Sequence, residues 1–163
     1  MNQQDQSLEL ARGNFEVFRK VLDTAEMKYE IYDGEAFLFH IGEGKDRHTF
    51  LVDFPAKKGK IEIRGIMFNG LDKVNRQISE QTAKLATATC AVNNILNIGS
   101  FVLDVKEGIM FFRLDYHYFD KVLEQHIVNS IYMLATILFL KYRDMFLNLI
   151  RGSLSLADFL SSI

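Results

Sequence analysis

The chain has 163 residues, a formal net charge of −2 and a pI of about 6.1. A chain of this length buries roughly 70% of its unfolded surface, so we expect one domain over residues 1–163 with one hydrophobic core. The nearly balanced charge argues against a nucleic-acid partner, because nucleic-acid-binding domains are usually strongly basic. The single cysteine, Cys90, excludes an internal disulfide and favours a reducing compartment.

Neither the start of the chain nor its most apolar stretch resembles a targeting or membrane segment. Residues 1–6 are polar, lack the basic-then-apolar order of a signal peptide and are expected to be disordered. The most apolar stretch, residues 127–140, contains Asn129, Ser130 and Thr136 and is shorter than the about 20 residues that a membrane-spanning helix needs. We therefore expect a cytoplasmic protein without a membrane partner.

The first helix is predicted over about residues 7–27. Apolar side chains recur there at every third or fourth position, with charged residues between them. These apolar positions are Leu8, Ala11, Phe15, Phe18 and Leu22.

Strands follow this helix. The Asp33-Gly34 pair predicts a tight turn, and alternating apolar residues predict strands near residues 37–41, 50–54 and 61–64. Their connections are too short for parallel crossovers, so the strands should pair antiparallel. Gly65 precedes a change in the phase of the apolar positions, which predicts a bulge or bend there.

A second helix is predicted to begin at Asp72 or Asn75 and to end before Gly99, which suits the left-handed position after a last helical turn. Two more strands, from Phe101 and from Ile109, are expected to form a hairpin.

A long third helix should run from about Asp120 to Ile150 and end at Gly152. Residues 153–163 form a short helical extension, in which Ser155 and Asp158 resemble a capping box. The predicted order is α-β-β-β-α-β-β-α. Because strands and helices are segregated, the predicted class is α+β with a mainly antiparallel sheet of about five strands.

Four short patterns in this chain are similar to a known family. Residues 94–97 (Asn-Ile-Leu-Asn), residues 101–104 (Phe-Val-Leu-Asp), Gly108 and the strand that reaches Tyr116 resemble the YbjN-like family. Its bacterial members are described as sensory transduction regulators and have the type III secretion chaperone-like fold. The similar order of elements covers about residues 15–150. The resemblance implies helices packed on an antiparallel sheet, a homodimer, and a chaperone-like or regulatory role in which segments of client proteins are bound.

The predicted third helix is apolar almost all round, and such a helix must be covered on both sides. The first helix could cover the second side, and so could another subunit. Because two-fold dimers are the commonest assembly, we expect a homodimer. The expected partner or dimer surface consists of Ile127, Ile131, Leu134, Leu138, Tyr142 and Met145. A small-ligand sensor is the alternative function, with Arg64, Arg113 and His117 as polar groups of a pocket between sheet and helix.

Two polar clusters resemble chemical sites but lack the required spacing. Asp115, His117, Asp120, Glu124 and His126 include metal-binding residue types, yet they have no zinc-site spacing and we interpret them as a polar strand end. The glycines of residues 40–48 lack the Gly-Lys-Ser/Thr of a phosphate loop, which favours a charged hairpin loop.

The remaining candidates are Cys90 and three asparagines. Cys90 lies among small residues, has no base in its neighbourhood and is expected to be buried. Asn93, Asn94 and Asn97 are expected to bond backbone groups at the helix end rather than to recognise a ligand. We therefore expect a non-enzymatic, protein-binding module with no catalytic residue, no metal and no cofactor.

Overall fold

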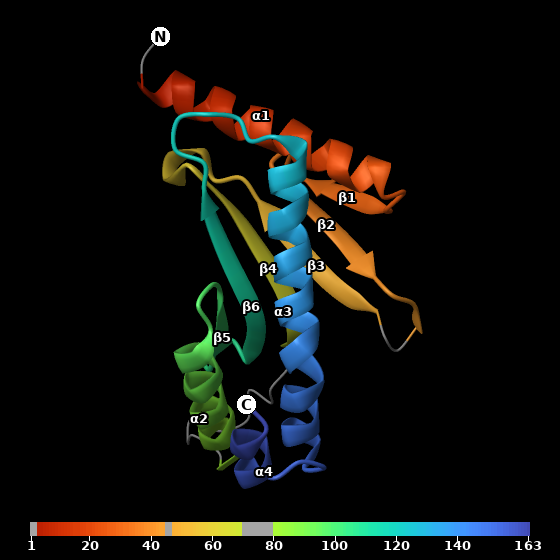
Figure 1. Ribbon diagram of the computed structural model, residues 1–163, viewed down its shortest axis with the longest axis vertical. Helices are drawn as coiled ribbons and strands as arrows, with labels where there is room; N and C mark the ends of the chain where they lie inside the picture. Colours follow the sequence, from red (N-terminus) through yellow and green to blue (C-terminus); the bar gives the residue numbers. More distant parts are fainter. Residues whose placement is uncertain (1–2, 45–46, 70–79) are drawn as a thin grey trace.

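The computed structural model describes residues 3–44, 47–69 and 80–163, and it has the predicted α+β class. Helix α3 lies along one face of a six-stranded antiparallel sheet, α1 crosses one end of that sheet, and α2 and α4 lie at the other end (Figure 1). The elements are α1 Gln3–Thr24, β1 Tyr29–Tyr32, β2 Ala36–Ile41, β3 His48–Asp53, η2 Ala56–Lys58, β4 Lys60–Asn69, α2 Glu80–Ile95, β5 Ser100–Asp104, β6 Ile109–His117, α3 Gln125–Arg151 and α4 Leu156–Ser161.

The sheet has the strand order β1-β2-β3-β4-β6-β5, with every neighbouring pair antiparallel. The predicted order is one strand short, because β1 pairs with β2 across the Asp33-Gly34 turn. Both of these residues have positive φ, 49° and 69°, and the Glu35 amide donates to the Tyr32 carbonyl at 3.0 Å across them. The strand order places β3 and β4 at the centre of the sheet, where Phe139 of α3 packs on Phe50 and Gly65.

Helix α1 begins at Gln3 rather than near residue 7, so residues 3–6 form its first turn instead of a disordered tail.

The buried face of α1 packs through an aromatic side chain. The ring of Phe18 lies 5.4 Å from that of Phe37, 6.2 Å from that of Phe39 and 5.9 Å from that of Phe54. Offset and edge-on aromatic contacts of this kind add to the stabilisation that buried area provides.

Gly65 allows α3 to lie close to the sheet. A Cβ at this position would be 2.6 Å from Cδ2 of Phe139. The predicted bulge exists, but the register of β4 against β6 shifts between Ile66 and Phe68 rather than at Gly65. Gly65 and Met67 therefore both lie on the buried face of the sheet. The close approach of the Phe139 ring explains why position 65 is a glycine.

Helix α2 is joined to β5 by one asparagine. Asn93 donates to the Phe101 carbonyl at 2.9 Å and accepts from the Phe101 amide at 2.8 Å. This confirms the predicted structural use of Asn93, whereas Asn94 and Asn97 are exposed. Gly99 has φ of +73°, as predicted for the residue that turns the chain after the helix. The predicted caps Asp72 and Asn75 lie outside the described residues.

The ends of α3 show which boundaries local signals determine. Gly152 has φ of +73° and donates to the Asn148 and Leu149 carbonyls, as predicted. Ser155 caps α4, because its hydroxyl accepts from the Asp158 amide at 3.1 Å. The predicted start at Asp120 is wrong, since α3 begins at Gln125. Contacts to α1 and η2 hold residues 118–123 out of the helix.

Candidate functional site

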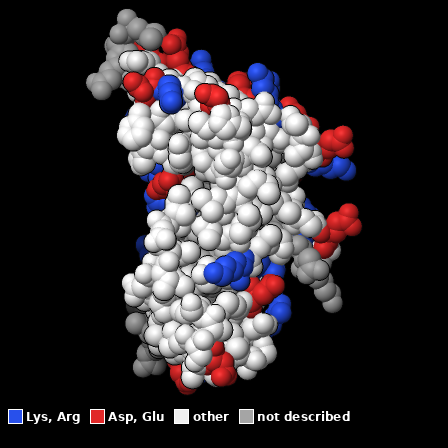
Figure 2. Space-filling view, in the orientation of Figure 1, with Lys and Arg blue, Asp and Glu red and all other residues white. Residues whose placement is uncertain are grey.

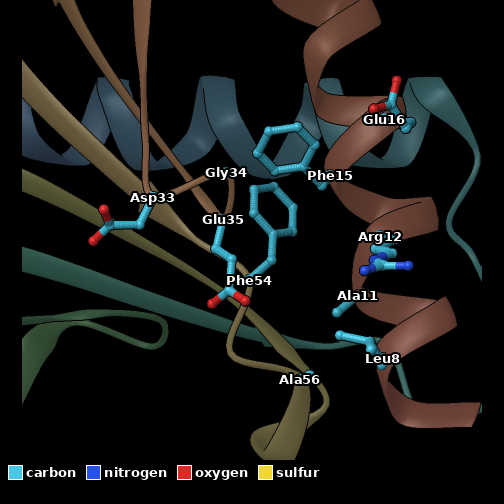
Figure 3. A pocket seen from close by; sticks show the side chains of 10 residues that line it. All are labelled: Leu8, Ala11, Arg12, Phe15, Glu16, Asp33, Gly34, Glu35, Phe54 and Ala56. Atoms are coloured by element: carbon cyan, nitrogen blue, oxygen red, sulfur yellow. The ribbon is translucent and has the colours of Figure 1, made fainter. Parts of the chain in front are cut away.

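In the described part of the chain, a hollow of about 530 Å³ lies between α1, the β1–β2 turn and η2. We call it the α1 groove and define it by its apolar lining of Leu8, Ala11, Phe15, Phe54 and Ala56. Figure 3 shows the rings of Phe15 and Phe54 next to each other between α1 and the turn, with Leu8 extending from α1 toward the same space.

The aromatic floor of the α1 groove is fixed by packing. The ring of Phe15 is stacked on that of Phe37 with centroids 4.2 Å apart, and it meets Phe54 edge-on at 5.6 Å. Phe54 is buried beneath it. The groove is therefore preformed rather than created by moving a side chain. The α1 groove could not be predicted from the sequence, because its walls come from segments far apart in the chain.

The rim of the α1 groove is charged. Asp33 and Glu35 stand on the β1–β2 turn, and Arg12 and Glu16 stand on α1, where Glu16 pairs with Arg19 at 2.7 Å. Neither Asp33 nor Glu35 forms an ion pair with another described residue. The β1–β2 side of the groove is thus acidic.

A second hollow continues from the groove past η2. It is lined by Lys57 and Lys58 and shares Leu8, Glu35 and Ala56 with the groove. Both lysines are exposed, and neither makes an ion pair within the part of the chain that the structure describes. The surface around η2 therefore changes from acidic to basic over a short distance.

Phe119 stands out from this basic side. Its side chain is 83% exposed and its φ is +51°, a conformation that costs a bulky residue about 1–3 kcal/mol. Phe119 and Gly59 line one small hollow, and Lys121 follows it in the loop. We call Phe119 with its neighbours Lys57, Lys58 and Lys121 the knob.

The loop that carries Phe119 is attached on both sides. The Tyr118 amide donates to the Gly59 carbonyl at 3.1 Å, and the Leu123 amide donates to Oδ1 of the buried Asn14 at 2.8 Å. Gly13 lets Val122 lie against α1, since a Cβ there would be 2.4 Å from Cγ2 of Val122. The knob is therefore presented by a fixed backbone.

The predicted pocket residues Arg64, Arg113 and His117 lie on the other face of the sheet and not between sheet and helix. Gly65 and Phe112 point toward the helices, so their neighbours Arg64 and Arg113 point away. Arg64 and Arg113 are register partners on β4 and β6, whereas His117 is exposed at the end of β6. The predicted pocket between sheet and helix is therefore wrong for these three residues.

Arg64 and Arg113 belong to an ionic network. The register aligns three carboxylates across β3, β4 and β6, which are Asp53, Glu62 and Asp115. Arg64 pairs with Asp53, and Arg113 pairs with Asp115 at 2.6 Å. The three carboxylates are balanced by three cations, because Lys60 is the third cation of the network.

Lys60 completes this network as its third cation. Its Nζ lies 2.6 Å from Glu62 and 2.9 Å from Asp115. Burial pushes the pKa of Asp115 up, but hydrogen bonds from Arg113 and Lys60 outweigh burial and hold that pKa below its usual range. The network is therefore neutralised internally and offers no unpaired charge to a ligand.

Helix α3 exposes an apolar stripe that shares only Leu134 with the predicted surface. Of the predicted surface, Ile131 and Tyr142 are buried, Leu134 is exposed, and Ile127, Leu138 and Met145 are half-buried. Tyr142 meets Phe101 inside the core with ring centroids 5.8 Å apart. The exposed stripe, which we call the α3 ridge, consists of Met133, Leu134, Ile137 and Leu140.

The α3 ridge lies on a face with few charges. Figure 2, which views the molecule from the side of α3, shows a broad area without acidic or basic residues across its middle, with basic and acidic side chains below it. Ile137 is 56% exposed at the centre of the ridge. Sequence periodicity could not select this stripe, because α3 carries apolar residues on nearly every side.

The other chemical candidates remain dispersed. His126 pairs with Glu124 at 3.4 Å, and both are exposed, while Asp115 belongs to the ionic network. No group of His, Cys, Asp and Glu side chains in the described residues could hold a metal ion. Cys90 is exposed on α2, which corrects the expectation of a buried thiol.

Comparison of the chain with protein-family models, curated proteins and solved structures finds no match. The resemblance to the YbjN-like family and its type III secretion chaperone-like fold therefore stays a prediction. Among residues 3–44, 47–69 and 80–163, no helix is long and apolar enough to span a bilayer.

Proposed function

We propose that the protein is a non-enzymatic, chaperone-like or regulatory module that binds a segment of a partner protein on the α3 ridge and acts as a homodimer. The α3 ridge carries this proposal. Met133, Ile137 and Leu140 follow one another at helical spacing on the exposed side of α3. Contiguous apolar patches on a protein surface often mark sites at which another protein binds.

The chemistry of the ridge favours an apolar protein segment as the occupant. A helix that presents apolar side chains at spacings of three and four residues is complementary to an apolar surface of a partner protein. The middle of the ridge has no carboxylate that would select a basic partner, so binding would depend on buried apolar area. Such binding weakens little when salt is added.

The test compares proteins that co-purify with three tagged forms of the chain. The forms are wild type, Ile137→Glu, and Ala86→Glu, which adds the same carboxylate at an exposed position of α2. We expect a partner with wild type and with Ala86→Glu, and its loss with Ile137→Glu. A partner retained equally by all three forms would contradict binding on the ridge.

A small-ligand sensor is the second candidate, and the α1 groove is the observation that favours it. Its volume of about 530 Å³ lies in the range of small-molecule sites, and its aromatic floor has a charged rim. A ligand at a hundred times its Kd would stabilise the protein by about 2.7 kcal/mol, which a thermal-shift screen detects. The Leu8→Arg variant, which changes the groove wall, should lose that shift.

A further inference from the structure

The surface around η2 has two unlike halves that fit each other. The knob carries one exposed aromatic ring with Lys57, Lys58 and Lys121. Two acidic residues lie near it: Asp120 follows the ring in the chain, and Glu35 lines the same hollow as Lys57 and Lys58. The α1 groove has a preformed apolar floor with Asp33 and Glu35 on its outer rim, and Arg12 is the exception on its inner rim. Ala56 lines both the groove and the hollow beside Phe119, so the two halves are neighbours.

We propose that Phe119 of one copy of the chain inserts into the α1 groove of a second copy, and that the second copy returns the contact. This inference rests on the homodimer of the proposed function and names its interface. A two-fold axis near Ala56 would bring the basic half of each copy opposite the acidic half of the other. Such a self-complementary surface is what a two-fold interface needs.

The fixed backbone of the loop favours a shaped protein pocket over a membrane surface as the partner of Phe119. Bonds to Gly59 and Asn14 fix the backbone on both sides of Phe119, so its Cα–Cβ bond leaves the protein in one orientation. A rigid anchor gains affinity from a pocket of fixed shape, because little ordering remains to be done on binding. Disordered lipid chains need no such orientation, and one phenylalanine is a small apolar insertion.

The charge pattern selects the α1 groove as that pocket. The lysines of the knob have no ion-pair partner in their own chain among the described residues, and neither do Asp33 and Glu35. Bringing them together across an interface aligns opposite potentials, which steers association and fixes the register of the contact. Phe15 and Phe54 supply the aromatic floor on which the Phe119 ring would pack.

The first test is sedimentation of the purified chain over a concentration range of about 1 to 100 µM. We expect a reversible dimer that weakens in about 1 M salt, where the screening length falls to about 3 Å. Removing a buried aromatic anchor weakens binding about 30-fold, and the contact occurs twice, so Phe119→Ala should raise the dimer Kd about a thousandfold. The side chain of Phe119 is exposed, so this variant should keep its fold.

A mixing experiment tests the pairing of knob with groove. Phe119→Ala lacks the knob, and Leu8→Arg places a cation at the wall of the groove. Each variant alone should be monomeric. A mixture should form a heterodimer, because one intact knob still meets one intact groove. Two monomeric variants that fail to associate when mixed would overturn the proposed pairing.

Fluorescence gives a reading from the site itself. The chain has no tryptophan, so Phe119→Trp introduces a single tryptophan at the knob, whose emission can be separated from that of the six tyrosines. Its emission should shift to shorter wavelength as the concentration rises and the dimer forms. A dimer in which the tryptophan emission stays at the wavelength of a water-exposed side chain would overturn this interface but not the homodimer. So would a dimer that still forms in Phe119→Ala. A chain that stays monomeric throughout would overturn both, but not partner binding on the α3 ridge, which the Ile137→Glu comparison tests separately.

Discussion

Replacing Asn14 by leucine should destabilise the protein and release the loop that carries Phe119. Asn14 is fully buried on α1, donates to the Leu10 carbonyl at 2.9 Å and accepts from the Leu123 amide at 2.8 Å. Leucine has a similar size but cannot accept a hydrogen bond. The Leu123 amide would then be buried without a partner, which costs about 1–3 kcal/mol.

Urea unfolding measures this cost. We expect the midpoint to fall by about 1 M, because 2 kcal/mol is divided by a slope of about 2 kcal/mol/M for a chain of this size, and we expect the slope itself to stay unchanged. Asn97→Leu is the control, since Asn97 is exposed and should change stability by less than about 0.5 kcal/mol. Equal midpoints for Asn14→Leu and Asn97→Leu would refute the role assigned to Asn14.

Three further predictions concern packing, pH and capping. Gly65→Ala should lose about 1–3 kcal/mol by overpacking against Phe139, and thermal unfolding should show the stability partly restored when Phe139→Leu is added. The pKa of Asp115 in the folded protein lies below its unfolded value of about 3.9, so Asp115 stabilises the fold above that pH and loses this effect as the pH falls through the folded pKa. Asp115→Asn should therefore flatten the acidic part of the curve of unfolding free energy against pH. An unchanged curve would count against the network. Ser155→Ala should cost about 1 kcal/mol and increase amide exchange in α4, and unaltered exchange would mean that the Asp158 amide needs no cap.

Local signals in the sequence predicted the features that a few neighbouring residues determine. Gly152, Gly99 and Ser155 ended or capped helices as expected, because each one acts on backbone groups within a turn. Alternation of apolar residues predicted the antiparallel strands from β2 onward for the same reason. The missing strand, β1, has only four residues and little burial, so its pattern is weak.

Features that depend on contacts between distant segments were not predictable. The role of Gly65 requires knowledge that Phe139 lies above it, and the start of α3 requires knowledge that Asn14 binds the Leu123 amide. The same limit applies to the candidate surfaces. Arg64 and Arg113 looked like ligand groups until the strand register brought carboxylates beside them.

The α3 ridge illustrates the limit of periodicity. When a helix is apolar on several sides, the sequence indicates that two faces are covered but not which one meets the sheet. The predicted surface included Ile131 and Tyr142, which face the core, and omitted Ile137, which does not.

The most direct test of partner binding is photo-crosslinking in living cells with a benzophenone amino acid at position 137. We predict adducts between the chain and one distinct second protein from this position, and no such adduct from a matched probe at the exposed position 86 of α2. Adducts to the same protein from both positions, or no adduct from position 137, would contradict the proposal that the α3 ridge binds a partner.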